Sequence, residues 1–217
     1  MSRSLPAGGP GYRLLRFLVR GLLRRVWGLC ADGFARLPQR GPFIIACNHP
    51  SEIDAIVLAA ALPFRPTYLA SRHIEQFPIL FWLARRFDPV FVRRGLSDIG
   101  AIRACLQRLE GGEVIVVFPE GRVVQDADLG PLHEGAAFLS IRSRAPIVPV
   151  ALVGTSAMWP LGARWPRRAR ISVRVGAPVP PDDNGRRAEA LTAEIDAALR
   201  RLVAAGQVES PVQRESH

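Results

Sequence analysis

Residues 42–47, Pro-Phe-Ile-Ile-Ala-Cys, and residues 114–118, Val-Ile-Val-Val-Phe, carry the clearest structural signal in this chain. Each is a short run that is apolar at every position, which is typical of a strand buried on both faces. Pro119 ends the second run. Strands of this kind, separated by helices, indicate an α/β fold in which helices flank a central, mostly buried mixed sheet.

Strand and helix patterns alternate on either side of these two runs. Further strands are expected at residues 67–70, 90–92, 147–153 and 170–175, the last alternating in polarity as an edge strand does. Helices are expected at residues 51–62, 78–87, 99–109, 135–143 and 187–205. We therefore predict one domain over residues 41–205, preceded by a basic segment at residues 1–40 and followed by a loose tail at residues 206–217.

Composition excludes several classes of protein. An apolar content of 48% over 217 residues is too high for a disordered chain. The three cysteines lie far apart in the sequence, which excludes a disulfide framework and a CxxC metal site and fits a reducing compartment. All 29 basic residues are arginine, against 19 acids, so the net charge is +10. Such a chain attracts nucleic acid, an anionic membrane surface or small anionic substrates.

Nucleic acid fits the sequence poorly. Aromatic residues make up only 7% of the chain, they are not interleaved with the arginines, and no nucleic-acid-binding motif is present. We therefore predict no nucleic-acid partner.

Residues 12–30 predict a basic amphipathic helix. At 100° per residue, one narrow stripe of this helix carries Arg13, Arg16, Arg20 and Arg24. The opposite face carries Leu15, Leu18, Val19, Leu22, Val26 and Leu29. The arginines argue against a bilayer-spanning helix and against a cleavable signal peptide. Trp27 and Phe17 at the boundary favour a helix lying in an anionic membrane interface, and the alternative is that its apolar face packs on the domain core.

Two expected strand ends carry polar side chains that can do chemistry. His49 follows the first apolar run and Asp54 comes five residues later, while Glu120 follows the second run. Sites in such sheets form beyond the carboxyl ends of the strands. If His49 lies in the loop and Asp54 in the first helical turn, the carboxylate can orient the imidazole of a general base.

The residues alone leave other interpretations of these positions open. Ser51 and Asp54 precede an apolar run with the spacing of a helix capping box, so Asp54 has a structural alternative. His49 has one too, as a buried structural histidine. Cys47 is a weaker candidate nucleophile, because it closes an apolar run.

Four sequence blocks together resemble the PlsC-like glycerolipid acyltransferase family, which includes the lysophosphatidic acid acyltransferases. The blocks are Asn48-His49-Pro50-Ser51-Glu52-Ile53-Asp54, Pro89-Val90-Phe91-Val92-Arg93-Arg94-Gly95, Phe118-Pro119-Glu120-Gly121-Arg122 and Ala145-Pro146-Ile147-Val148-Pro149-Val150. They occur in the family's order and spacing, and the first has the NHxSxxD form of its H-x4-D motif. The resemblance covers residues from about 33 to 180.

The resemblance implies an O-acyltransferase with His49 and Asp54 as catalytic residues. His49 would be the general base on the hydroxyl of a lysophospholipid acceptor, and acyl-CoA or acyl carrier protein would be the co-substrate. It implies no metal and no other cofactor. The implied substrate-binding positions are Arg93, Arg94, Ser51, Glu120, Gly121, Arg122 and Pro149. The enzyme would sit peripherally on the cytoplasmic face of a membrane.

The third block departs from the commonest family pattern. That pattern reads FPEGTRS, whereas Arg122 here directly follows Gly121. The acceptor expected from the resemblance is 1-acylglycerol-3-phosphate, which would give phosphatidate. Another lysolipid or glycolipid hydroxyl is the first alternative, and a non-catalytic protein that binds lipid or acyl carrier is the second.

Overall fold

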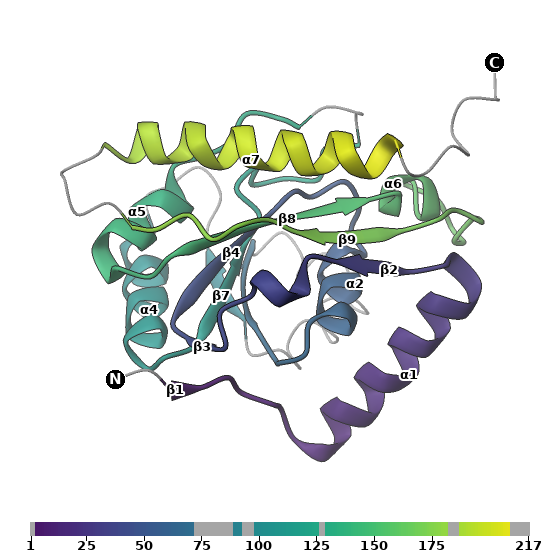
Figure 1. Ribbon diagram of the computed structural model, residues 1–217, viewed down its shortest axis with the longest axis horizontal. Helices are drawn as coiled ribbons and strands as arrows, with labels where there is room; N and C mark the ends of the chain where they lie inside the picture. Colours follow the sequence, from purple (N-terminus) through teal and green to yellow (C-terminus); the bar gives the residue numbers. More distant parts are fainter. Residues whose placement is uncertain (1–2, 72–88, 93–97, 126–128, 182–186, 209–217) are drawn as a thin grey trace.

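The computed structural model describes residues 3–71, 89–92, 98–125, 129–181 and 187–208. A seven-stranded sheet runs through its centre in the order β2-β9-β8-β4-β7-β5-β6 (Figure 1). These strands are Cys30–Asp32 (β2), Phe43–Cys47 (β4), Thr67–Ser71 (β5), Val90–Val92 (β6), Val114–Val117 (β7), Ile147–Val153 (β8) and Ser172–Val175 (β9). All neighbouring strands are parallel except β8 and β9, so the sheet is mixed, as predicted.

Helices cover both faces of this sheet. They are Pro10–Trp27 (α1), Asp54–Ala61 (α2), Ile99–Glu110 (α4), Gly135–Ser143 (α5), Thr155–Met158 (α6) and Ala188–Val208 (α7). A short 3-10 helix spans Phe34–Arg36 (η1), and Arg3–Ser4 (β1) pairs with Arg40–Gly41 (β3). Residues 78–87, for which we predicted a helix, lie outside the described residues. Residues 209–217 of the predicted tail also lie outside them, while α7 continues three residues past position 205.

The two central strands show why apolar runs become buried strands here. In β4, the side chains of Phe43, Ile45 and Cys47 enter the core on the α1/α2 face. Ile44 and Ala46 enter the second core, which α4, α5 and α7 cover. All five residues of β4 are fully buried, because a parallel strand with helices on both sides has no solvent face.

The predicted edge strand is not at the edge. β9 lies between β8 and β2, and β2 forms the edge of the sheet. Arg174 gives β9 its polar alternation but is only 8% exposed, and its guanidinium faces the Asp32 carboxylate of β2 at 3.9 Å. The helix predicted for residues 12–30 ends earlier, at Trp27, and Cys30 is the first residue of β2.

α1 contacts the domain through a face that combines apolar and basic side chains. Leu23 is buried and Val19 packs against the same core. Arg16 donates to the carbonyl oxygen of Leu62, and Arg20 donates to that of Ala61 at 3.5 Å. These arginines satisfy carbonyls at the C-terminus of α2, where positive charge also complements the helix dipole.

Most of the predicted apolar face of α1 remains exposed as a result. The large apolar side chains that are 46–73% exposed on this helix are Leu14, Leu15, Phe17, Leu18, Leu22 and Val26. Of the face predicted from the sequence, only Val19 and Leu29 turn towards the domain. Among the residues that the structure describes, no helix is both long and apolar enough to cross a bilayer.

Candidate active site

Residues 48–53, the candidate catalytic loop, connect the carboxyl end of β4 to α2. Asn48 holds its first residue in place, because its side-chain amide donates to the Leu152 carbonyl at 2.9 Å and accepts from the Leu152 N–H at 2.7 Å. His49 is held from the other side, since its N–H donates to Glu120 Oε1 at 3.1 Å and its carbonyl accepts from the Val124 N–H at 2.9 Å. Both backbone groups of the candidate base are therefore fixed.

The His49 ring meets the Asp54 carboxylate as the sequence predicted. Nδ1 of His49 lies 2.9 Å from Oδ2 of Asp54, the first residue of α2. Asp54 is fully buried, whereas the His49 side chain is 20% exposed. When Nδ1–H donates to a carboxylate, Nε2 carries the free lone pair, which is the arrangement that a general base needs.

Asp54 contacts His49 and also has part of the capping role that was the structural alternative for this residue. Its Oδ2 also accepts the Ser51 N–H at 2.7 Å, which is one half of a capping box. The other half is missing, because the Asp54 N–H donates to the backbone carbonyl of Ser51 at 3.2 Å, and Ser51 Oγ donates to the Trp159 carbonyl at 2.8 Å. The helix that we predicted to begin at Ser51 begins at Asp54. Ser51, predicted to bind substrate, is buried and bonded to this neighbouring segment.

The ring of Phe118 stacks on the ring of His49. The two rings stack with centroids 4.1 Å apart and an interplanar angle of 20°. The ring of Tyr68 also lies near that of Phe118, with centroids 6.4 Å apart and nearly parallel planes. This stack, together with Asp54, fixes the plane of the imidazole.

The remaining predicted site residues divide into three groups. Glu120, Gly121 and Arg122 follow β7 at the same end of the sheet as His49, and Gly121 has a φ of +67° that favours glycine. Arg122 is exposed. Pro149 is buried inside β8 opposite Ala46, so the structure does not bring it to the loop at His49. Arg93 and Arg94 lie outside the described residues.

Cys47 is ruled out as a nucleophile by its surroundings. Its side chain is completely buried, and burial, with the charges of Asp54 and Glu120, raises the pKa of the thiol well above its usual value. A thiol in this position stays protonated and out of contact with solvent.

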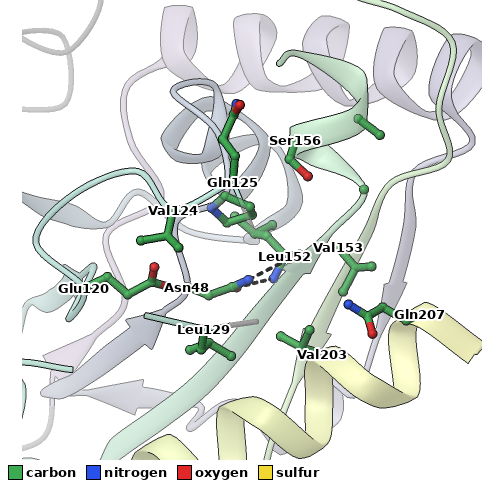
Figure 2. Close-up of a pocket in the computed structure, with 13 residues that line it drawn as sticks. Asn48, Glu120, Val124, Gln125, Leu129, Leu152, Val153, Ser156, Val203 and Gln207 are labelled. Atoms are coloured by element: carbon green, nitrogen blue, oxygen red, sulfur yellow. Dashed lines mark hydrogen bonds between the residues drawn. The ribbon is translucent and has the colours of Figure 1, made fainter. Parts of the chain in front are cut away.

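A cavity of about 320 Å³ adjoins the candidate catalytic loop at Asn48 and Pro50 (Figure 2). Asn48 and Glu120 line it on the side of the loop, and Val203 and Gln207 of α7 line it opposite. One buried polar atom at its wall, Nε2 of Gln125, has no hydrogen-bond partner among the described residues. The His49 ring lies on the other side of the loop, towards α2. Sequence reasoning missed the cavity, because its walls come from four separate parts of the chain.

The ionisation of Glu120 gives a testable effect on stability. Burial raises the pKa of this carboxyl above its usual 4.5, although the hydrogen bond from the His49 N–H opposes the shift. Between pH 4.5 and the raised pKa the folded state therefore binds more protons than the unfolded state, so this group makes the free energy of unfolding fall as pH rises through that interval. Glu120→Gln keeps an acceptor for the His49 N–H and should remove this fall. Urea unfolding at a series of pH values checks it, and parallel curves for the two proteins would contradict it.

Comparison with protein families gives an independent result. A family model described as Acyltransferase matches residues 30–153 of the chain. The chain belongs to this acyltransferase family. The match contains His49, Asp54 and the Phe118–Arg122 block, so the resemblance read from the motifs is confirmed.

Several relatives within the family have assigned activities. The 1-acyl-sn-glycerol-3-phosphate acyltransferase of Bacillus subtilis is 28% identical over 66% of this chain and 69% of its own length. Enzyme BAT2 of Brassica napus, with the same activity in its name, is 27% identical over 61% of this chain and 39% of its own length. A lyso-ornithine lipid O-acyltransferase of Pseudomonas aeruginosa is 29% identical over 52% of this chain and 43% of its own length. The chain thus spans less than two thirds of the length of the Brassica and Pseudomonas enzymes.

The fold also occurs in a solved structure. The crystal structure of PlsC from Thermotoga maritima, a 1-acyl-sn-glycerophosphate acyltransferase, matches with a TM-score of 0.74 and 21% identity. The match covers 95% of this chain and 83% of that one, which confirms the predicted fold class.

Proposed function

We propose that the protein transfers a fatty acyl group from an acyl thioester to the free hydroxyl of 1-acylglycerol-3-phosphate, giving phosphatidate. The observation that carries this proposal is the pair formed by His49 and Asp54, with Nδ1 2.9 Å from Oδ2. The names of the Bacillus and Brassica relatives support the choice of acceptor. Acyl-CoA or acyl carrier protein is the proposed donor.

The proposed reaction needs one base that also returns its proton. Nε2 of His49 takes the proton of the acceptor hydroxyl while that oxygen attacks the thioester carbonyl carbon. The tetrahedral intermediate collapses, the C–S bond breaks, and the imidazolium gives its proton to the leaving thiolate. Asp54 keeps Nδ1 protonated and stabilises the imidazolium between these two steps. The reaction balances without a metal or redox cofactor, so we keep the prediction that none takes part.

A second candidate acceptor has a specific observation in its favour. The Pseudomonas relative acts, by its name, on lyso-ornithine lipid, which has no phosphate. The third sequence block here is FPEGR, with Arg122 next to Gly121. Acylation of another lysolipid hydroxyl is therefore the alternative function, with His49 and Asp54 in the same roles.

Product analysis distinguishes the two acceptors. The purified chain is incubated with acyl-CoA, and separately with acyl carrier protein thioesters, on vesicles that contain one lysolipid at a time. We expect phosphatidate from lysophosphatidate as the main product by mass spectrometry. A product from a phosphate-free lysolipid alone would replace the proposed acceptor with the alternative. No product from any acceptor with either donor would favour a non-catalytic binding protein.

We further propose that α1 attaches the enzyme to the cytoplasmic face of a membrane, where both lipids reside. The exposed apolar side chains of this helix, including Leu18 at 57% and Leu22 at 55%, support the proposal. So do the exposed arginines Arg13, Arg24 and Arg25, because basic side chains beside an apolar face attract anionic headgroups.

Replacing two of these exposed leucines tests the attachment. Leu18→Ser with Leu22→Ser should lower partition onto anionic vesicles by about tenfold or more, because two large apolar side chains no longer enter the interface. Thermal unfolding should change little, since both side chains already face solvent. Ile99→Ser is a matched control, because Ile99 is 69% exposed on α4, far from α1 in Figure 1. Equal partition of the double variant and the control in vesicle sedimentation would contradict the attachment.

A further inference from the structure

The segment between α6 and β9, residues 159–168, presents apolar and basic side chains together on the surface. Trp165 is 72% exposed and Leu161 is 60% exposed. Arg164, Arg167 and Arg168 are exposed as well. Large exposed apolar side chains surrounded by arginines form the kind of surface that binds where apolar and anionic groups meet.

This segment adjoins the C-terminal end of α1. Nε1 of Trp27, the last residue of α1, donates to the carbonyl oxygen of Arg167 at 2.8 Å. The N–H of Ile171 donates to the Trp27 carbonyl at 3.2 Å. In Figure 1 the segment lies at the end of the molecule that the last turn of α1 reaches. The exposed apolar face of α1 ends there with Val26, which is 50% exposed.

The conformation of the segment is fixed by its own hydrogen bonds. Nε1 of Trp159 donates to the Ala163 carbonyl at 3.0 Å, and the Arg167 N–H donates to the Met158 carbonyl at 2.7 Å. These bonds close a loop with Trp165 at its outer side. The loop also connects to the candidate catalytic loop, because Ser51 Oγ donates to the Trp159 carbonyl.

We propose that residues 159–168 form a second membrane contact, in which Trp165 and Leu161 enter the interface of an anionic bilayer and the three arginines meet its headgroups. The inference rests on the proposed function, which places the acceptor in a bilayer. α1 alone would give the enzyme a single line of contact with the membrane. The second contact would bring the loop that holds His49 towards the lipid, because Ser51 of that loop is bonded to Trp159 of the segment.

The chemistry of these side chains matches a bilayer better than a protein partner. Indole rings prefer the headgroup level of a membrane, where the ring is shielded and its N–H remains hydrated. Residues 160–187 contain seven arginines and two acids, so the surrounding chain is strongly basic. Anionic lipid attracts such a cluster without needing a defined shape.

Partition onto vesicles tests the contribution of Trp165 and Leu161 to membrane binding. We expect Trp165→Ala combined with Leu161→Ala to bind equimolar phosphatidylglycerol and phosphatidylcholine vesicles about five- to tenfold more weakly than the parent. Ile99→Ala is the matched control, since it removes an equally exposed side chain from α4. Both changed residues face solvent, so thermal unfolding should be unchanged. A loss no larger than that of Ile99→Ala would overturn the proposal.

Tryptophan fluorescence tests insertion directly, without relying on affinity. The emission of the parent minus that of Trp165→Phe isolates the signal of Trp165. We expect this difference spectrum to shift to the blue on addition of anionic vesicles and to be quenched by lipids brominated near the glycerol. A difference spectrum that keeps its position and intensity would overturn the proposal.

Two double variants test the contribution of the arginines to membrane binding. Arg164→Gln with Arg168→Gln should weaken binding to anionic vesicles severalfold and leave binding to pure phosphatidylcholine unchanged. Arg103→Gln with Arg142→Gln is the control, because both arginines are exposed on α4 and α5. Equal effects of the two pairs would contradict headgroup contact by this loop. None of the three assays depends on acyl transfer, so they test the second membrane contact by itself. If the chain acylates no lysolipid, the proposed function fails but the second contact can still be confirmed.

Discussion

His49→Ala should lower acceptor-dependent acyl transfer by about 10³- to 10⁴-fold, since it removes the base placed to take the hydroxyl proton. His49 is partly exposed, its Nδ1 is bonded to Asp54, and its ring plane is fixed by Phe118. All other steps of the proposed reaction depend on this proton transfer. The initial rate of thiol release on lysolipid vesicles measures the effect.

A second variant separates loss of the base from loss of the fold. His49→Ala leaves the buried Asp54 carboxylate with one partner fewer, which by itself destabilises the protein. His49→Asn places a side-chain amide near the position of Nδ1, so it can still donate to Asp54 but cannot act as a base. We expect it to be as inactive as His49→Ala and closer to the parent in thermal unfolding. Substantial activity in either variant would refute the proposed mechanism.

Asp54→Asn should lower the rate by up to about 10⁴-fold, the loss that this change causes in the aspartate of a hydrolase triad. The asparagine oxygen can still accept the Ser51 N–H, but a neutral amide no longer ensures that Nδ1 of His49 carries the proton. The negative charge beside the imidazolium is lost as well. The rate difference therefore measures the role of Asp54 in fixing the tautomer together with its electrostatic role. Thiol release under the same conditions gives its size.

Two comparisons show whether Asp54 acts through His49. Asp196→Asn is the matched control, because Asp196 is a surface carboxylate of α7 paired with Arg200 at 2.7 Å. It should leave the rate unchanged. The double variant His49→Ala with Asp54→Asn should be no slower than His49→Ala alone, since groups that act as a unit are not additive. A further fall in the double variant would show that Asp54 has an independent role.

The segments predicted correctly are those in which buried residues occur at every position or at a regular spacing along the chain. β4 and β7 are apolar at every position because both sheet faces are covered, so the sequence pattern alone identifies them. α5 and β8 were predicted with the same first and last residues that the structure shows. The edge strand β2 was missed, because three residues with two exposed side chains carry no pattern.

Some features could not be predicted because they depend on contacts between distant segments. β9 alternates in polarity like an edge strand, but β2 pairs with its outer side and the buried Arg174 lies beside Gly206 of α7. The inward direction of Arg16 depends on the position of the C-terminus of α2, 46 residues later. For the same reason the sequence showed the arginines of α1 only as a stripe opposite the apolar face, and not that Arg16 and Arg20 contact the domain.

The contact between His49 and Asp54 was predicted from a local pattern, whereas the other candidate site residues were predicted from motif position. Five residues separate His49 from Asp54, and a loop followed by a helical turn allows the two side chains to meet. Ser51 and Pro149 were assigned to substrate binding from motif position alone. The structure gives Ser51 a bond to Trp159 and buries Pro149 in β8, which sequence position cannot reveal.

The most direct test of the proposed mechanism is acceptor-dependent thiol release by the purified chain and by His49→Asn on the same vesicles. We expect the parent to release coenzyme A from acyl-CoA only when lysophosphatidate is present, with one phosphatidate formed for each thiol released. We expect no release above background by His49→Asn under either condition. Equal rates of lysophosphatidate-dependent release by the two proteins would contradict the assignment of His49 as the base.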